Sequence, residues 1–263
     1  MNKITKRYGK QVVLDNIEFE INSKCILIIG ENGSGKTTLF KILSGLIKRY
    51  EGQIDLSSNV SYLPDSESLF LSKSGLDNLD YFLNKEELEK SKYYINYFHM
   101  NEYISKRVRS YSNGMKKKLA LTLALSRNKD YLILDEPTNS LDIESIELLK
   151  KEIKILKENK NIIISSHDVS IFDIDLIDTI YLIKNHKLYQ KDLEEFNFSY
   201  YKIKTIDDIS NLDYVKEEDG YYYFKVFNNN INNFSEMISK YKILEMIKIE
   251  YYNEIYVRGI IND

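Results

Sequence analysis

The stretch that decides the fold is Gly30-Glu31-Asn32-Gly33-Ser34-Gly35-Lys36-Thr37. It directly follows residues 25–29, a continuous apolar run of the kind expected for a strand buried on both faces. It precedes residues 38–43, in which apolar residues recur at helical spacing. A P-loop requires a glycine-rich loop between a strand and a helix, so the stretch predicts a phosphate-binding loop. The alternative is a glycine-rich turn without a ligand.

Each residue type in this loop has a physical reason to be there. Glycines let the backbone fold around phosphate oxygens, and the following helix aims its free N–H groups and the positive end of its dipole at them. Lys36 would reach the β- and γ-phosphates, and the hydroxyl of Thr37 would ligate Mg²⁺. The chain is therefore predicted to bind a nucleoside triphosphate.

Bulk composition narrows the class of protein further. A chain of 263 residues can hold one large or two unequal domains. Its net charge of −3 argues against a general nucleic-acid binder, which would carry a basic excess. The single cysteine, Cys25, excludes a disulfide framework and is expected to serve packing. No apolar run approaches the roughly 20 residues of a membrane span, so we expect a protein of the cytosol or of a membrane's cytosolic face.

Strand and helix patterns alternate along most of the chain. The first twenty residues alternate in strand fashion around a turn expected at Asp15-Asn16, which predicts an antiparallel layer. Strands are expected at 52–55 and 60–63, a helical block at 72–127, then a strand, a helix and another strand through residue 165. Alternating strands and helices predict a parallel sheet covered by helices.

The pattern changes beyond about Asp192, where short tyrosine-rich strands and one small helix predict a small α+β domain. Strands are expected at 200–204, 221–227, 242–250 and 254–260, with a helix at 234–238. The tyrosines at 200–201 and 221–223 could stack on nucleic-acid bases. We find no accompanying basic residues, which favours ordinary half-buried strand tyrosines.

A second pair of candidate functional residues is Asp135-Glu136, which follows the apolar strand at 132–134. A parallel strand delivers these carboxylates to its carboxyl end, where ligands bind in α/β sheets. Asp135 would hold Mg²⁺ directly or through water, and Glu136 could polarise the water that attacks the γ-phosphate. The alternative is an acidic turn at a strand end.

His167 follows the next strand, in Ser165-Ser166-His167-Asp168. An imidazole there can form a hydrogen bond with the γ-phosphate or with the catalytic carboxylate. A lone histidine is more often structural, and we interpret His99 and His186, which lack this context, in that way.

Together with Ser112-Asn113-Gly114-Met115-Lys116, these motifs resemble the ATP-binding subunit of an ABC transporter of the antibiotic- or multidrug-exporter type. The resemblance covers about residues 1–190. It implies a P-loop NTPase with a mixed sheet and an antiparallel β layer at 1–192, with an inserted helical subdomain at about 66–127. A separate small α+β domain would occupy 193–263.

The resemblance also implies roles for individual residues. Tyr8 would stack on adenine, Asp135 would be the Walker B aspartate, Glu136 the catalytic glutamate and His167 the switch histidine. Mg²⁺ would be held by Thr37, Asp65 and Asp135, and the loop at 140–142 would pass between two subunits. The residues implied to bind ATP are Tyr8, Gly30, Asn32, Gly33, Ser34, Gly35, Lys36, Thr37, Thr38, Ser112, Asn113 and Gly114.

Three features near these motifs need interpretation. The signature motif at 112–116 has Asn113 where the family usually has glycine. Asparagine tolerates the left-handed backbone region, so the shape of this loop should be kept.

Asp65 stands where the family has a glutamine that contacts Mg²⁺ and couples to the membrane subunit. A carboxylate could ligate Mg²⁺ through water but cannot donate a hydrogen bond. The lysines at 116–118 would be an exposed run, or would be offset by a partner's triphosphate.

The function implied by the resemblance is that of an ATP-hydrolysing, energy-coupling subunit at the cytoplasmic face of the cell membrane. It would form a head-to-tail homo- or heterodimer with a second ATP-binding subunit, and residues 65–109 would dock on a separate multi-helix membrane subunit. No nucleic-acid partner is expected. Two alternatives are a soluble ABC-type ATPase acting on ribosomes or nucleic acid, and a non-catalytic partner subunit.

Overall fold

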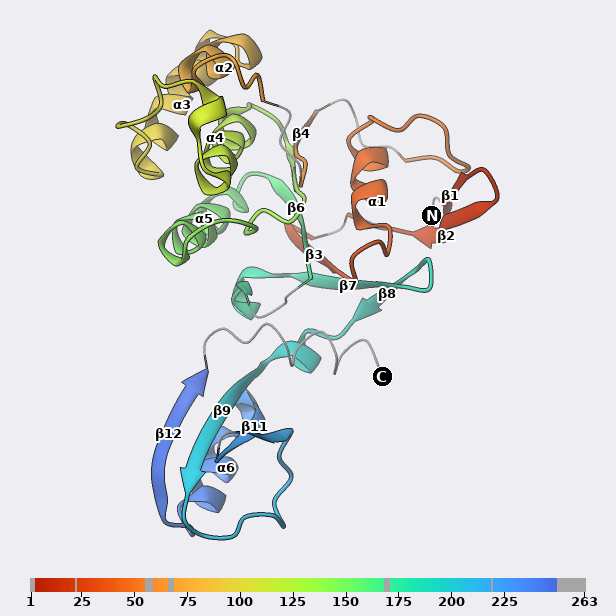
Figure 1. The fold of residues 1–263 in the computed structure, drawn as a ribbon. Coiled ribbons are helices and arrows are strands. Elements are labelled where there is room, and N and C mark those ends of the chain that lie inside the picture. The colour runs from red at the N-terminus through yellow and green to blue at the C-terminus, as the bar shows by residue number, and fades with distance from the viewer. Residues whose placement is uncertain are drawn as a thin grey trace. The chain divides into compact units, whose positions relative to one another are not determined.

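The computed structural model describes residues 3–21, 23–54, 59–65, 69–167, 171–218 and 220–249, and within these limits the chain forms two compact units (Figure 1). The first unit comprises residues 1–167 and 175–191, and the second comprises 168–174 and 192–263. Each unit has its own sheet and its own hydrophobic core.

The first unit is built around a six-stranded sheet with the order β4-β5-β6-β3-β7-β8. Neighbouring strands from β4 to β7 are parallel, and β8 is antiparallel to β7. All five residues of β3 are buried, as expected for a strand in the middle of a sheet covered on both faces. The strands are β3 (Cys25–Ile29), β4 (Val60–Leu63), β5 (Tyr131–Leu134), β6 (Asn161–Ser166), β7 (Thr179–Lys184) and β8 (Lys187–Lys191).

The helices of this unit fall into separate groups. Figure 1 shows α2, α3 and α4 together and well apart from α1. Capping boxes define the starts of α2 and α3, where Ser74 pairs with Asp77 and Asn84 with Glu87. The helices are α1 (Lys36–Leu43), α2 (Gly75–Phe82), α3 (Lys85–Tyr97), α4 (Asn113–Ser126) and α5 (Ile143–Leu156), with short 3₁₀ turns at Val108–Ser110 and Ile174–Leu176. The predicted α/β sheet with an inserted helical block is confirmed.

The antiparallel layer consists of β1 (Lys3–Tyr8) and β2 (Gln11–Glu18). The prediction of a turn at Asp15-Asn16 is wrong, because both residues lie within β2. The chain reverses at Gly9, whose φ is 59°, and β2 continues through Asn16. Asn16 has a φ of 55° and its N–H donates to Thr5 Oγ1 at 2.9 Å, beside a shift in strand register. Here asparagine's tolerance of the left-handed region produces a bulge inside a strand instead of a turn.

The strand expected at 52–55 does not form over its described residues. Glu51 makes an isolated bridge with Thr5, and residues 52–54 are irregular, while Asp55 lies outside the described residues. Gly52 has a φ of 100°, which interrupts an extended backbone, and a Cβ at this position would collide with the carbonyl of Lys3.

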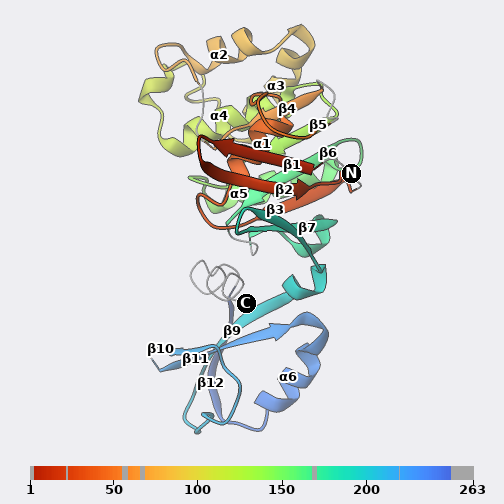
Figure 2. The ribbon, with the colours of Figure 1, turned by 90° about the vertical axis from the view of Figure 1, so that its right-hand side faces the viewer.

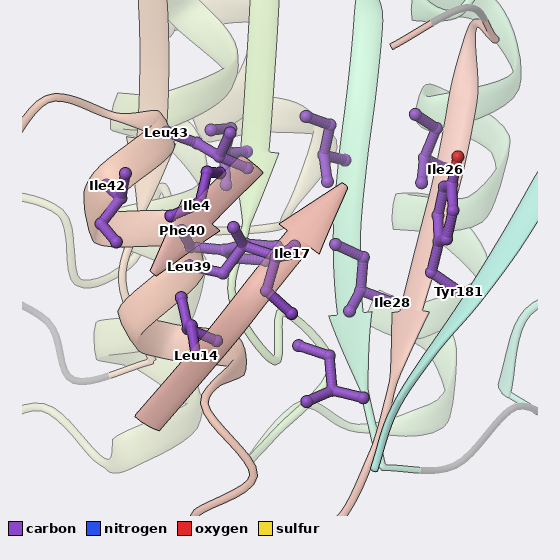
Figure 3. Packing of buried hydrophobic residues seen from close by; sticks show 13 residues of the cluster. Ile4, Leu14, Ile17, Ile26, Ile28, Leu39, Phe40, Ile42, Leu43 and Tyr181 are labelled. Atoms are coloured by element: carbon purple, nitrogen blue, oxygen red, sulfur yellow. The ribbon is translucent and has the colours of Figure 1, made fainter. Parts of the chain in front are cut away.

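The main core of the first unit holds α1 against the N-terminal hairpin. Figure 3 shows Leu14 and Ile17 of β2 facing Leu39 and Phe40 of α1, all fully buried. Burying each such side chain stabilises the fold by about 1.5–3 kcal/mol. The glycine-rich loop lies against the same hairpin, because a Cβ on Gly35 would come within 2.9 Å of Leu14 Cδ2. The core thus fixes the loop that precedes α1.

The second unit is an antiparallel sheet of order β10-β11-β9-β12 with α6 packed on one face (Figure 2). Ile203, Phe224 and Phe234 form the centre of its core. The elements are β9 (Phe198–Thr205), β10 (Lys216–Glu218), β11 (Tyr221–Phe227), α6 (Ile231–Ile238) and β12 (Ile243–Ile249), with 3₁₀ turns at Leu193–Phe196 and Asn228–Asn230. This is the predicted α+β arrangement; the strand expected at 254–260 lies outside the described residues.

Basic residues do lie beside the tyrosines of this unit, contrary to the expectation from the sequence. The pairing of β9 with β11 brings Lys202 and Lys204 over the ring of Tyr221, with Nζ at 4.7 and 5.4 Å from the ring centre. These lysines could not be matched to the ring before the strand register was known. The Tyr221 hydroxyl donates to Glu245 of β12 at 2.5 Å, so these groups are engaged with one another across the sheet.

Two further observations bear on the sequence predictions. Cys25 is buried in β3, and burial raises the pKa of its thiol to about 12, which suits a packing role. Within the described part of the chain, no helix combines the length and the apolar character needed to cross a bilayer.

Candidate nucleotide site

The glycine-rich loop connects β3 to α1 at the carboxyl end of the sheet's central strand. Gly33 and Gly35 have φ values of 83° and 111°, which side-chain-bearing residues rarely adopt. Gly35 is the N-cap of α1, and no side chain caps the helix. The N–H groups of the first turn are therefore left for a ligand, as an anion-binding helix start requires.

Lys36 places its ammonium group across the mouth of this loop. Its side chain is only 6% exposed, and Nζ donates to the carbonyl oxygens of Gly30 at 2.6 Å and Glu31 at 3.2 Å. Nζ also lies 3.3 Å from Oε1 of Glu136. The P-loop lysine and the predicted catalytic carboxylate are thus an ion pair in this structure.

Glu136 is buried two residues after the end of β5, in a backbone conformation with a φ of 46°. Its Oε2 lies 2.9 Å from Nδ1 of His167, at the end of β6. Burial alone would raise the pKa of this carboxyl, but the hydrogen bond with His167 and the charge of Lys36 outweigh it and lower the pKa. Glu136 is therefore ionised at neutral pH, which is the form a general base needs.

Asp135 is fully buried, and both of its oxygens accept hydrogen bonds from neutral donors. The hydroxyl of Ser165 donates to Oδ1 at 2.6 Å, and the hydroxyl of Tyr62 donates to Oδ2 at 3.2 Å. Among the described residues no lysine, arginine or histidine forms an ion pair with Asp135. A buried carboxylate without a cationic partner is costly, so the arrangement fits a bound cation.

Sequence reasoning missed Ser165 and Tyr62 as site residues. Ser165 joins the two carboxylate residues, because its Oγ also accepts a hydrogen bond from the backbone N–H of Glu136 at 2.9 Å. Burial, together with the negative charge of Asp135, raises the pKa of Tyr62 far above its usual range, which keeps its hydroxyl a donor. Strand periodicity held a signal for Ser165, because residues two apart along an extended segment lie on the same side and Ser165 stands two residues before His167, which directly follows β6.

The other predicted metal ligands are Thr37 and Asp65. Thr37 is half-buried in the first turn of α1. Asp65 is exposed, and its Oδ1 accepts a hydrogen bond from Asn139 Nδ2 at 3.2 Å. Over the described residues, no cluster of three or more His, Cys, Asp or Glu side chains could hold a metal ion by itself. A site here would need oxygens from a phosphate or from water.

The signature residues lie in another part of the unit. Ser112 is the N-cap of α4 and its Oγ accepts from the N–H of Met115 at 3.2 Å. Asn113 is the first residue of α4 and has no positive φ, so the left-handed tolerance expected of it is not used. Figure 1 shows α4 well apart from α1. One chain therefore does not bring Ser112–Gly114 to its own glycine-rich loop.

Tyr8 and the lysine run complete the predicted set. Tyr8 is half exposed at the end of β1, with Lys6 Nζ 4.6 Å from its ring centre. The interpretation of residues 116–118 as an exposed run is wrong, because Lys117 is fully buried and Lys118 pairs with Asp142 at 3.1 Å.

Comparisons with known proteins place this fold and site in a family. The family described as ABC transporter matches residues 14–139. An uncharacterised ABC transporter ATP-binding protein of Methanocaldococcus jannaschii is 33% identical over 195 residues, which cover 71% of this chain and 74% of that protein. The chain belongs to the ATP-binding proteins of the ABC transporter family, and it is an ATPase of this class.

Two solved structures share the fold. An ATP-binding subunit of an ABC transporter aligns with a TM-score of 0.68 and 22% identity, covering 74% of this chain and 90% of the other. A dimeric ATP-binding cassette, bound to ADP and Pi in a post-hydrolysis state, aligns with a TM-score of 0.63 and 20% identity, covering 73% of this chain and 99% of the other.

Proposed function

We propose that this chain is the energy-coupling subunit of a transporter, in which Glu136 activates the water that hydrolyses ATP held by the loop at 30–38. The proposal is supported above all by the row Lys36–Glu136–His167, whose members follow three neighbouring strands of the sheet, β3, β5 and β6. Phosphate-binding groups and an ionised carboxylate at the same sheet edge are what hydrolysis of a bound triphosphate requires.

Each member of the row has a separate task. Lys36 would exchange its loop carbonyls for oxygens of the β- and γ-phosphates, which also separates it from Glu136. Glu136 would then accept a proton from the attacking water at Oε1, the oxygen that lies 3.3 Å from Lys36 Nζ in this structure and that Lys36 would leave for the phosphates. His167 would hold Oε2, so that Oε1 stays aimed at the water.

Thr37 and Asp135 are the residues we assign to Mg²⁺. The metal would supply positive charge that neutralises the phosphate oxygens. Ser165 and Tyr62 would orient the Asp135 carboxylate for this task, since each already donates to one of its oxygens. The carboxylate of Asp65, the third predicted ligand, accepts a hydrogen bond from Asn139 in this structure.

A second ATP-binding subunit would complete the site in a head-to-tail dimer. The start of α4 offers the N–H groups of a helix end, and Ser112–Gly114 are separated from the chain's own loop. The residues of a partner's α4 would therefore close over the triphosphate, and Tyr8 would stack on its adenine. The fold's likeness to a dimeric cassette supports this assembly. The partner could be a second copy or a different ATPase.

The membrane subunit would dock on the exposed apolar side chains around the start of α2, which we call the α2 patch: Phe70 and Leu71 precede the helix, and Leu76 and Tyr81 belong to it. The ring of Phe70 stacks on Phe82 at 5.3 Å and meets Tyr81 edge-on at 4.8 Å, which holds these rings in place. Exposed apolar patches of this kind serve protein interfaces. The chain would then act at the cytoplasmic face of the cell membrane, and the signature at 112–116 favours an exporter.

The hydrolysis claim is tested by comparing Glu136→Gln with Glu144→Gln, an exposed glutamate of α5. Loss of a general base should lower turnover at least 100-fold in the first variant, and the second should match the wild type. If Glu136→Gln hydrolyses ATP at the wild-type rate, Glu136 is not the base.

The membrane claim is tested by recovering the tagged chain from native membranes. We expect a multi-helix membrane protein to accompany the wild type and to be lost in Leu71→Glu. Leu46→Glu, which changes an even more exposed leucine outside the patch, should retain it. Recovery of ribosomes or nucleic acid instead would support a soluble ABC-type ATPase.

A further inference from the structure

A buried lysine beside Tyr8 has no task in the proposed mechanism. Lys6 stands two residues before Tyr8 in β1, and residues at this spacing share one face of a strand. The Lys6 ammonium lies 4.6 Å from the centre of the Tyr8 ring. Lys6 is only 8% exposed, whereas Tyr8 is 50% exposed. A buried charge therefore contacts a ring that is half open to solvent.

The surroundings of the Lys6 ammonium supply few groups that offset its charge. Nζ donates to the backbone carbonyl oxygen of Arg49 at 2.7 Å, and no carboxylate of the described residues forms an ion pair with it. Burying a lysine away from carboxylates is unfavourable, and an apolar side chain would be buried there at lower cost. The π system of Tyr8 is the other group that attracts the cation.

The position of this ammonium is well defined, because its carbonyl partner belongs to a segment that is tied to β1. Thr5 and Glu51 exchange two backbone hydrogen bonds, at 2.9 and 3.0 Å, which join β1 to the chain that follows α1. Arg49 lies two residues before this bridge. The Lys6 ammonium is thus fixed between the Arg49 carbonyl and the ring of Tyr8.

The same part of β1 lies close to the phosphate-binding loop. Lys6 pairs with Leu14 of β2 in the register of the hairpin, and a Cβ on Gly35 would come within 2.9 Å of Leu14 Cδ2. Tyr8 is two residues further along β1, about 7 Å at the rise of an antiparallel strand. This spacing suits a nucleotide that has its phosphates in the loop and its base at Tyr8.

We propose that Lys6 is a positioning residue for the base of the nucleotide, because its ammonium covers one face of the Tyr8 ring and leaves the opposite face to the base. The proposal rests on the proposed function, in which Tyr8 stacks on adenine. A ring that is already held in place loses less freedom when the base binds. A cation on one face also draws π electrons away from the other, which favours stacking on an electron-rich purine.

The test compares the binding of ATP with that of inorganic tripolyphosphate, which lacks the base and the sugar, by calorimetry in the presence of Mg²⁺. Lys6→Met should weaken ATP binding about fivefold, the effect of one cation–π contact, and should leave tripolyphosphate binding unchanged. Lys6→Arg keeps a cation over the ring and should bind ATP like the wild type. Lys3→Met, which changes an exposed lysine of the same strand, is the matched control and should bind both ligands normally.

Two results of this comparison would overturn the role of Lys6. Equal weakening of ATP and tripolyphosphate in Lys6→Met would mean that Lys6 supports the fold and not the base. Unchanged ATP binding in Lys6→Met, with Tyr8→Ala weakened, would mean that the ring needs no cation, and the stacking assigned to Tyr8 would stand.

A double variant shows whether Lys6 acts through the ring. In the Tyr8→Ala chain, Lys6→Met should cause no further loss of ATP affinity, because the ring that transmits its effect is gone. A second fivefold loss would place the action of Lys6 elsewhere and overturn the inference. Normal ATP binding by Tyr8→Ala alone would instead refute the stacking in the proposed function, and the role of Lys6 with it.

Discussion

Replacing Ser165 with alanine would test how the two carboxylates are held. The hydroxyl of Ser165 is fully buried, donates to Asp135 at 2.6 Å and accepts from the N–H of Glu136 at 2.9 Å. Its removal therefore deletes one hydrogen bond to a charged group and one to a backbone N–H, and leaves both partners buried without it. Bonds of these two kinds contribute about 2 and about 1 kcal/mol. We expect a loss of about 3 kcal/mol in the free energy of unfolding.

Thermal and urea denaturation measure this loss. For a domain of this size, 1 kcal/mol corresponds to about 2–4 °C in Tm, so Tm should fall by about 6–12 °C. Ser126→Ala is a matched control, because the hydroxyl of Ser126 is equally buried but has no hydrogen-bond partner among the described residues. Removing it should leave Tm unchanged or raise it. If Ser165→Ala unfolds at the same temperature as Ser126→Ala, the hydroxyl does not hold the carboxylates in the way described.

The remaining predictions concern pH, packing and salt. Ser145, together with Lys118, lowers the pKa of Asp142 to about 2 from an ordinary value of 3.8, so its charge stabilises the fold above pH 3.8, and this stabilisation is lost as the pH falls through 2. The stability difference between wild type and Asp142→Asn should be constant above about pH 5, fall on acidification and disappear by about pH 1. A difference that grows on acidification would contradict this. Gly114→Ala should cost about 1–3 kcal/mol in urea unfolding, because the new Cβ would press on the Ser140 carbonyl, and a variant as stable as the wild type would show that the loop can move away. Lys116→Gln should weaken ATP-driven dimerisation more at low salt than at high salt, since it stands at the helix start that would face a partner's triphosphate; equal affinities at both ionic strengths would exclude this contact.

The fold and half of the site could be predicted because their signals are local. The glycine-rich loop, the apolar run of β3 and the Asp135-Glu136 pair each lie within a few consecutive residues. Strand–helix alternation then implies a parallel sheet whose carboxyl ends meet at one edge. That rule alone is enough to bring Lys36, Glu136 and His167 together, as the structure does.

The contacts that hold the site in shape could not be predicted, because they depend on the order of strands in the sheet. Tyr62 reaches Asp135 only because β4 is the neighbour of β5, and Ser165 does so because β6 is its neighbour on the other side. The burial of Lys117 depends on how α4 packs, and a run of three lysines gives no sign of it. The misplaced turn at Asp15-Asn16 has a similar cause, since asparagine favours bulges and turns alike.

The most direct test of the central claim is the mass of the Glu136→Gln chain in solution with ATP and Mg²⁺, measured by analytical ultracentrifugation. The account predicts a stable dimer that retains ATP, because the nucleotide closes two composite sites and the variant cannot hydrolyse it. The pairing partner would be supplied by the second copy, or by the companion ATPase when it is added. A chain that binds ATP but stays monomeric under both conditions would contradict the claim that Ser112–Gly114 of a partner complete the site.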